Sequence, residues 1–369
     1  MATNRSRVIF PAAALFAGPA GSTGQHFSSG SSGTNLINQI PRAQSASLNF
    51  DVTLTDVNQL GQLAALDRLI LESPTVSMDI SWLLVDGKAE STLGFQAKGQ
   101  ATFISGQLDK TNDDRNYFLL ISPEGSDAIG NTQTGLQNVI SVGNGFVSNY
   151  TLNLAVGQLP TASLTIEGLN IKVDTGSFDK TLPAVNPLNG RPITAWNFTI
   201  PTATAYTGVG IVSALRPGDV VLEFPATAGI GNILSGAGSV NIQSVNFSLP
   251  LSRETLNRLG SPFAFSRELA VPIQSTMTIE ALQADLRESN LADLLCNNQS
   301  YNFRVRLKKP DCEGTGANAI VLDYRNAKLQ SQAFGVDIGG AATTTLTFQN
   351  QLAGLGDTSN GFFFSGDYS

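Results

Sequence analysis

The sequence predicts an all-β protein with short helices, built as two tandem β-sandwich or barrel domains, each with a flanking short helix. Short apolar alternations rich in Val, Ile, Thr, Phe and Gly are separated by turns, as in antiparallel sandwiches and barrels. A segment near the beginning of the chain recurs in its second half. The length of 369 residues is enough for two domains with cores of their own.

The recurrence is an ungapped match between residues 43–82 and 242–281, in which nine of 40 positions are identical. Residues 154–169 and 336–351 resemble one another in the same way. The second copy is 17 residues shorter between these motifs, so we expect loops such as 106–116 to hold the additional residues. The identical pairs are Gln44/Gln243, Ser45/Ser244, Asn58/Asn257, Leu60/Leu259, Gly61/Gly260, Ala65/Ala264, Arg68/Arg267, Met78/Met277 and Ile80/Ile279.

Each copy opens with a strand, and alternation over residues 43–54 places Leu48, Phe50, Val52 and Leu54 on one face. A short helix is expected next. Thr53 and Ser252 are its cap residues, and Gly61 and Gly260 end it.

Strands are then expected over 75–84 and 274–282, and a further short helix over 289–296, capped by Ser289. Residues 216–225 are expected to form the first strand of the second domain and echo residues 7–11. Trp196, Phe198 and Ile200 are candidates for one strand in the connection between the domains.

These elements predict four regions along the chain. They are an extended N-terminal arm rich in Gly and Ser over 1–40, a first β domain over 41–175, a linker over 176–215 and a second β domain over 216–369.

Charged residues make up only 14% of the chain, which suits a protein that buries much of its surface against copies of itself. The net charge of −7 argues against a grip on nucleic acid through its phosphates. Cys296 and Cys312 indicate neither a zinc cluster nor a disulfide framework, although pairing between them stays open. No apolar run approaches a membrane-spanning helix. We interpret the start as an extended segment rather than a secretion signal, because Pro11 interrupts its apolar run.

Residues for catalysis or metal binding are sparse. His26 is the chain's one histidine and lies in the Gly/Ser arm, a poor place for a base that needs fixed geometry. Asp109, Asp113 and Asp114 lack the spacing of a calcium loop, and Glu72 with Asp79 is not marked as a glycosidase pair. Residues 24–33 are glycine-rich without a following P-loop lysine. We therefore expect no catalytic, cofactor or metal site, and no enzyme.

Two features suggest contacts instead. Arg68 and Arg267 occupy equivalent places, where each could pair with a carboxylate at a subunit contact or be an ordinary exposed charge. Phe362, Phe363 and Phe364 would be an aggregation risk if exposed, so they are buried in a neighbour or in the chain's own core.

Residues 24–84 resemble the N-terminal half of tail proteins from tailed bacteriophages, and residues 244–282 resemble the strand–helix–Gly–strand signature of phage tail tube proteins. The resemblance covers about half of the chain and implies a structural role. In that family, six β domains form a ring, inner strands join into a continuous lumen, and rings stack into a tube. Two fused domains imply a trimer with pseudo-sixfold symmetry, while hexamers of two-domain chains stay open.

The resemblance also implies a place in the virion tail, assembly in the host cytoplasm, and self-assembly with other tail proteins as partners. DNA would pass through the lumen without specific binding during genome ejection, and no membrane is implied. The alternatives are another virion structural protein, such as a tail terminator, decoration or fibre-base component, or a carbohydrate-binding β-sandwich. The last is disfavoured because only two Trp residues exist and Trp82 lies in a predicted core strand.

Overall fold

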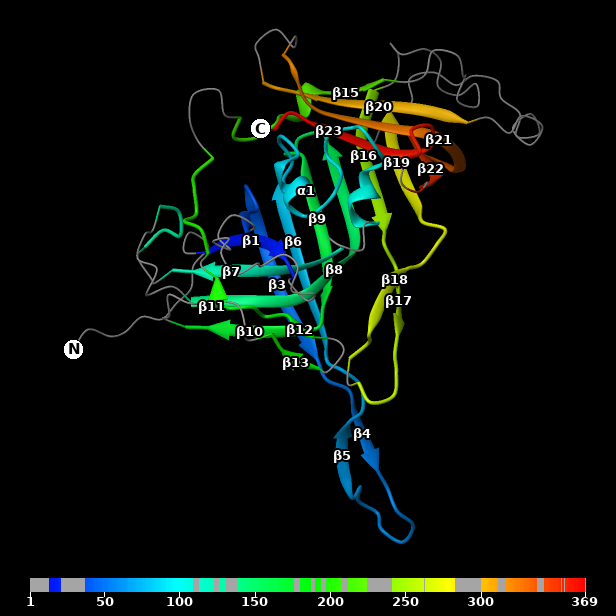
Figure 1. Cartoon of the computed structure of the whole chain (residues 1–369). Coiled ribbons are helices and arrows are strands. Elements are labelled where there is room, and N and C mark those ends of the chain that lie inside the picture. The colour runs from blue at the N-terminus through cyan, green and yellow to red at the C-terminus, as the bar shows by residue number, and fades with distance from the viewer. Residues whose placement is uncertain are drawn as a thin grey trace.

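The molecule is dominated by β-strands, as a computed structural model shows (Figure 1). Its helices are short: α1 (Lys88–Thr92) and the 3-10 helices η3 (Phe103–Gln107) and η5 (Pro217–Asp219). The all-β class with short helices is therefore confirmed. The structure describes residues 13–20, 37–108, 113–122, 126–130, 138–175, 180–186, 190–193, 197–198, 200–206, 212–223, 241–261, 263–282, 300–310, 316–336, 342–352, 354 and 356–368.

The first copy of the repeat and the connection after it contain fourteen of the strands. They are β1 (Ala13–Pro19), β2 (Asn38–Gln39), β3 (Ala43–Asp51), β4 (Leu54–Val57), β5 (Asp67–Ile70), β6 (Thr75–Leu83), β7 (Asp114–Ile121), β8 (Asn138–Ala155), β9 (Thr161–Gly168), β10 (Asn170–Asp174), β11 (Lys180–Thr181), β12 (Val185–Asn186), β13 (Arg191–Pro192) and β14 (Asn197–Phe198).

The second copy repeats the longer ones. Its strands are β15 (Val220–Glu223), β16 (Asn241–Pro250), β17 (Arg253–Leu256), β18 (Ser266–Leu269), β19 (Gln274–Leu282), β20 (Tyr301–Lys308), β21 (Asn318–Gly335), β22 (Thr343–Gln351) and β23 (Gly361–Gly366).

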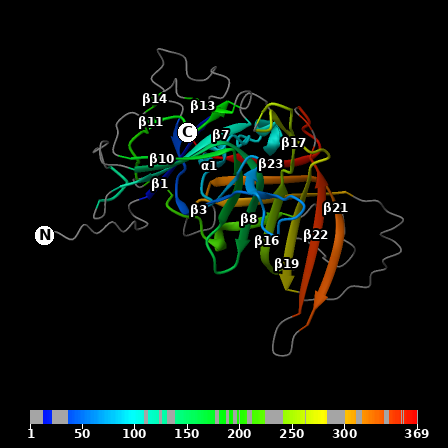
Figure 2. The same cartoon turned by 90° about the horizontal axis from the view of Figure 1, so that it is seen from below.

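Eight antiparallel strands form one composite sheet across both copies, in the order β3-β6-β9-β8-β16-β19-β22-β21. Figure 2 shows β8, β16, β19, β22 and β21 side by side in this curved sheet. The long strands β8 and β21 each continue into a second, outer sheet. In the first copy that sheet contains β1, β7 and β10, and in the second copy it contains β15, β20 and β23.

The duplication extends to the register of every shared ladder. Adding 199 to positions in β3–β6 gives their partners in β16–β19, adding 186 to β7 gives β20, and adding 182 to β8 and β9 gives β21 and β22. Positions related in this way are called equivalent below. The offset decreases from 199 to 186 between β6 and β7 and from 186 to 182 between β7 and β8. The additional residues of the first copy therefore lie in these two connections. The predicted loop 106–116 overlaps the first of them, but it was predicted too long, because residues 114–116 already pair in β7 and residues 106–107 belong to η3.

The β-bulges also recur at equivalent places. The bulged residue is Gln44 in β3 and Gln243 in β16, one of the identical pairs, and each amide donates to the carbonyl two residues earlier. Asn116 in β7 and Asn302 in β20 are a second such pair. Because a bulge re-aims a strand, equal bulges give the two copies equal curvature.

The long strands turn from one sheet to the other at equivalent asparagines. Asn144 in β8 and Asn326 in β21 have φ of 50° and 57°, a left-handed conformation that asparagine tolerates better than most residues. Their backbone N–H groups donate to the side-chain oxygens of the bulged Asn116 and Asn302. A bulge in one strand therefore holds the bend in its neighbour.

The helices predicted after the front strands are wrong, because residues 54–57 and 253–256 are β4 and β17. Each pairs with a second short strand, β5 or β18, in a long hairpin that continues beyond the composite sheet (Figure 1). Gly61 and Gly260 have φ of 88° and 83°, so they turn the hairpin tips rather than end helices. Cross-strand pairing outweighed the local cap signals, which turns and helix ends share.

One apolar core fills the space between the sheets of both copies, with Trp82, Tyr150, Phe247 and Tyr324 among its members. A second cluster lies outside β1 and β7, where Leu182, Ile200 and Ala203 pack against Phe16 and Phe118. Residues between the two copies thus cover the outer sheet of the first.

Candidate functional site

The open face of the composite sheet is mostly polar. Alternate residues of its strands are buried in the core, so the residues between them form the opposite face. Within the six described central strands this face holds three carboxylates and no Lys or Arg, and its apolar residues, Leu83, Phe146, Ala155, Pro250 and Leu282, lie toward the strand ends. Its polar members are Thr75, Ser77, Asp79, Ser81, Asn149, Thr151, Asn153, Thr161, Ser163, Thr165, Glu167, Ser244, Asn246, Ser248, Gln274, Thr276, Thr278, Glu280, Thr343, Thr345, Thr347, Gln349 and Gln351.

Hydroxyl groups on this face bond to one another across neighbouring strands. Thr151 and Ser163 are 2.6 Å apart, and Thr165 donates to Asp79 over 2.8 Å. Ser244 donates to Glu280 over 3.2 Å. The face is thus polar and weakly acidic, and all three of its carboxylates have partners within the described chain.

The two copies meet where β8 pairs with β16. Leu152 lies opposite Phe247, and Leu154 lies opposite Val245, all four buried. The ladder is extended at both ends by backbone hydrogen bonds from Leu251 N to Ser148 O and from Val156 N to Gln243 O, 2.8 and 2.9 Å long. This internal joint makes one sheet from two.

The edges equivalent to this joint lie open at the two ends of the composite sheet. β3, equivalent to β16, pairs with β6 alone, and the second half of β21, equivalent to the joint half of β8, pairs with β22 alone among the described strands. Phe334 is 53% exposed, whereas its equivalent Leu152 is 2% exposed. Phe50 is 59% exposed, whereas its equivalent Leu249 is 0% exposed. Both open edges therefore carry the apolar residues of a sheet joint.

The hairpin of the second copy lies against the first copy. Arg253 of β17 forms a 3.3 Å ion pair with Asp113 and stacks on the ring of Phe146. Arg267 of β18 lies 3.8 Å from Glu167 of β9 and is 10% exposed. Burial raises the pKa of Asp113 to about 6 in spite of the attraction of Arg253.

The hairpin of the first copy is exposed along its whole length, on both β4 and β5. Arg68, equivalent to Arg267, pairs at 2.8 Å with Asp56 of the same hairpin and is 67% exposed. The structure thus places a carboxylate next to each of the two predicted arginines, across the joint for Arg267 and within the hairpin for Arg68.

A groove of about 540 Å³ lies on the second copy beside the open half of β21. It is lined by Gln274, Asn326, Lys328, Leu329, Gln330, Gln349, Asn350, Gln351, Leu352 and Asn360. Lys328 and Gln349 are equivalent to Phe146 and Glu167, which contact the docked hairpin together with Asp113. The groove is therefore the counterpart of an occupied docking place.

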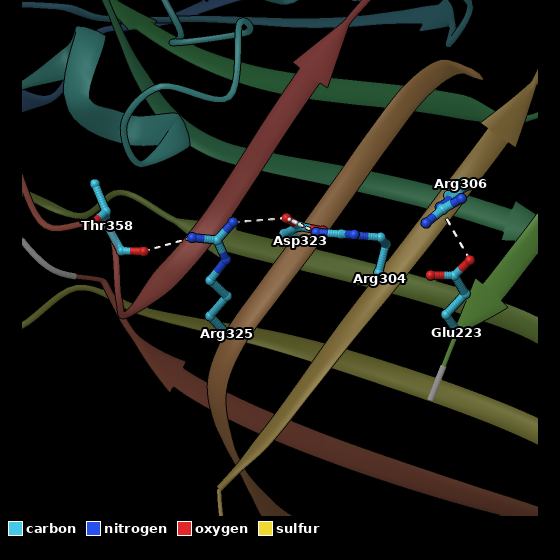
Figure 3. Close-up of polar contacts among 6 residues, drawn as sticks. All are labelled: Glu223, Arg304, Arg306, Asp323, Arg325 and Thr358. Carbon is cyan, nitrogen blue, oxygen red and sulfur yellow. Dashed lines mark hydrogen bonds and ion pairs between the residues drawn. The ribbon is translucent and has the colours of Figure 1, made fainter. Parts of the chain in front are cut away.

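The outer sheets differ sharply in charge. In the second copy Arg304 and Arg325 both bond Asp323, and Arg306 pairs with Glu223 across β15, β20 and β21 (Figure 3). The equivalent face of the first copy carries the buried Phe16, Phe118 and Leu120. The outer sheet that described residues of the connection cover is thus apolar, and the outer sheet of the second copy carries a ladder of ion pairs.

Glu90 on α1 is a fully buried carboxyl whose protonation can change near neutral pH. Its carboxylate accepts from Trp82 Nε1 at 3.0 Å and from Tyr150 Oη at 3.3 Å. Burial raises the pKa of Glu90 to about 7. It lies in the apolar core rather than in a cleft, so its surroundings indicate a structural role.

The other candidates were not brought together. Asp79 lies on the open sheet face and accepts from Thr165, and Glu72 lies in the exposed connection three residues before β6, so neither is placed in a cleft as a glycosidase pair would be. Phe362, Phe363 and Phe364 are buried in the chain itself, and Phe362 stacks on Phe247 with ring centres 3.9 Å apart. His26, Asp109, Trp196, Ser289, Cys296, Cys312 and the predicted helix 289–296 lie outside the described residues.

Within the described residues, no group of three or more His, Cys, Asp or Glu side chains is arranged to hold a metal ion. In the same part of the chain, no helix has the length and apolar character needed to cross a membrane.

No family model matches the chain, and no curated protein matches its sequence. Among solved structures it is similar to a chain of the anti-feeding prophage (AFP) baseplate, with 14% identity, a TM-score of 0.26, and coverage of 41% of this chain and 93% of that one. It is also similar to a chain in the tail of an empty gene transfer agent (GTA) particle, with 13% identity, 37% and 92% coverage, and a TM-score of 0.22. A chain of the native GTA virion gives 15% identity, 37% and 92% coverage, and a TM-score of 0.20.

Proposed function

We propose that this chain is a structural subunit of a phage tail tube, which assembles head to tail into rings that stack around a channel for DNA. The observation that carries the proposal is the internal joint between β8 and β16. The chain closes one such joint and leaves its two halves open at opposite ends of the same sheet. Two edges that fit one another on one molecule favour a closed ring over a pair.

The resemblance to rings of six β domains implies three chains per ring. If every joint repeats the internal one, each chain contributes two units to a pseudo-sixfold ring. Eight strands per chain then give about 24 strands around the channel. At about 4.8 Å per strand the circumference is about 115 Å and the diameter roughly 37 Å, larger if the strands tilt. Side chains of about 5 Å leave roughly 25 Å, enough for duplex DNA of about 20 Å.

The chemistry of the open face supports its assignment to the channel wall. A surface of hydroxyls and amides with three carboxylates and no Lys or Arg in its six central strands offers few contacts to phosphates, so DNA would move along it without specific binding; Lys328 of β21 is the cation at its edge. If the other face of the composite sheet lined the channel, the apolar core residues would face the DNA.

Negative-stain electron microscopy of the purified protein, with its solution mass, tests the proposal. We expect rings or stacked tubes with a three-chain repeat. Phe334→Lys should abolish assembly by placing a charge at the open edge. Val173→Lys, at an exposed apolar position of β10 in the outer sheet, is the matched control and should assemble. Isolated monomers at every concentration would argue for a peripheral virion protein, and equal assembly of both variants would show that the open edge of β21 is not the contact between chains.

A further inference from the structure

We infer that β3 of one chain pairs with β21 of the neighbouring chain in the ring, in the register of the internal joint. The β4–β5 hairpin of the first chain then fills the groove beside Lys328 and Gln349 of its neighbour. The inference rests on the proposed ring and specifies its contact. A second molecule of this chain occupies both the open edge and the groove.

The register follows from the ladders within the chain. In the internal joint Phe247 lies opposite Leu152 and Ser248 opposite Thr151. Replacing each residue by its equivalent places Leu48 of one chain opposite Phe334 of the neighbouring chain, and Asn49 opposite Ala333. Because β-bulges recur at equivalent places, both strands have the curvature that this register needs.

The side chains that meet in this register are complementary in size. The internal joint pairs Phe247 with Leu152, and the joint between neighbouring chains pairs Leu48 with Phe334. The aromatic and the aliphatic residue have exchanged sides while their combined volume is kept, a change that packed interfaces tolerate well. The partly buried Leu48 already packs against the core, so Phe334 would extend that core across the joint.

The hydrogen-bonding pattern is also determined. Leu251 bonds Ser148 in the internal joint, and bonded pairs alternate along an antiparallel ladder. Ser248 and Thr151 are therefore a non-bonded pair, and so are their equivalents Asn49 and Ala333. Cα atoms of such pairs are about 4.5 Å apart, within the range that a disulfide bridges.

The groove supplies the independent observation. The docked hairpin places Arg253 and Arg267 over Phe146 and next to Glu167 of the first copy. The equivalent groove has Lys328 and Gln349 at these places, and the equivalent hairpin has Leu54 and Arg68. Arg68 would meet the amide of Gln349. The exposed apolar residues of the hairpin, which include Leu54 and Ile70, would be partly covered.

Cysteine cross-linking tests the register. In a background with Cys296→Ser and Cys312→Ser, the full chain carries Asn49→Cys with Ala333→Cys. The shifted controls combine Asn49→Cys with Ser331→Cys or with Gly335→Cys, which lie on the same face two residues away. We expect the first pair to form covalent oligomers of up to three chains at least tenfold faster than either control.

The groove is tested by Gln349→Glu, which restores the carboxylate that Arg267 meets in the internal joint. It should lower the concentration needed for assembly about two- to fivefold, as a surface ion pair allows, and Arg68→Ala should cancel the gain. Rings that cross-link through a shifted pair, or a gain independent of Arg68, would overturn the contact and leave the ring proposal standing. Chains that stay monomeric and cross-link through none of the pairs would overturn both.

Discussion

The two hairpins of this chain have the same register and the same turn glycine, yet their environments are opposite. The β17–β18 hairpin lies against the first copy, with Arg253 and Arg267 largely buried beside Phe146. The β4–β5 hairpin is exposed on both strands. The difference comes from what stands next to each hairpin along the composite sheet. One has the other half of its own chain as a neighbour, and the other is at the edge.

The comparison explains why equivalent positions differ in chemistry while their backbones agree. Where the neighbour is always present, the chain uses groups that depend on burial, such as the pair of Arg253 and Asp113. The open hairpin carries Leu54 and the exposed ion pair of Arg68 and Asp56. Neither needs to be buried for the single chain to be stable. Equivalent substitutions in the two places should therefore have very different effects on the single chain.

The largest difference is expected at the sheet joints. Leu152→Ala should lower the free energy of unfolding by about 2–5 kcal/mol, because it leaves a cavity in the core. Phe334→Ala, at the equivalent exposed position, should cost less than about 1 kcal/mol in the single chain. Urea unfolding of dilute, monomeric protein measures both. Equal losses would show that Phe334 is buried in the single chain and would contradict an open joint at β21.

A buried carboxyl in the first copy should make stability depend on pH. Burial raises the pKa of Glu90 from 4.5 to about 7, so the unfolded chain loses this proton first. The contribution of Glu90 to the free energy of unfolding should be greatest below about pH 4.5, fall as pH rises to about 7, and then stay low, a change of about 3 kcal/mol. In urea unfolding followed from pH 4.5 to 8, Glu90→Gln should remove this part of the pH dependence and leave the part that comes from Asp113, whose pKa burial raises to about 6. Glu254→Gln, at an exposed position, is the control and should keep it.

The docked hairpin should be sensitive to loss of its arginine. Arg253→Ala leaves the half-buried Asp113 without its partner and should cost about 2 kcal/mol. Arg68→Ala breaks an exposed pair and should cost between zero and about 1 kcal/mol. Thermal unfolding of the monomer compares them, and a larger loss for Arg68→Ala would show that the exposed hairpin is held by contacts within the single chain.

The smallest effect should be the same in both hairpins. Gly61 and Gly260 have φ near +85°, where a Cβ atom is unfavourable, and the space beyond each is open. Gly61→Ala and Gly260→Ala should each cost about 1 kcal/mol. Hydrogen exchange of the hairpin amides reports the local loss. A difference of more than about 0.5 kcal/mol between them would mean that docking changes the turn itself.

The repeat was visible in the sequence because identical residues mark shared backbone devices. Gln44 and Gln243 are the bulged residues, and Gly61 and Gly260 are the turn residues. The strands 75–84 and 274–282 were predicted within one residue, because their alternation is strong. The hairpins were mistaken for helices, since a cap residue and a glycine eight residues later mark either structure when the strand that pairs with them is not known.

Composition and local pattern by themselves determined the all-β class, the duplication and the lack of a recognisable catalytic motif, because these depend on neighbours in sequence. Tertiary structure alone decided which edges are closed. Leu152 and Phe334 are both apolar strand residues, and nothing near them in sequence distinguishes the buried one from the exposed one. That distinction depends on β16 lying beside β8, a pairing between residues about a hundred positions apart. Burial and pKa follow from such pairings, which local sequence patterns do not encode.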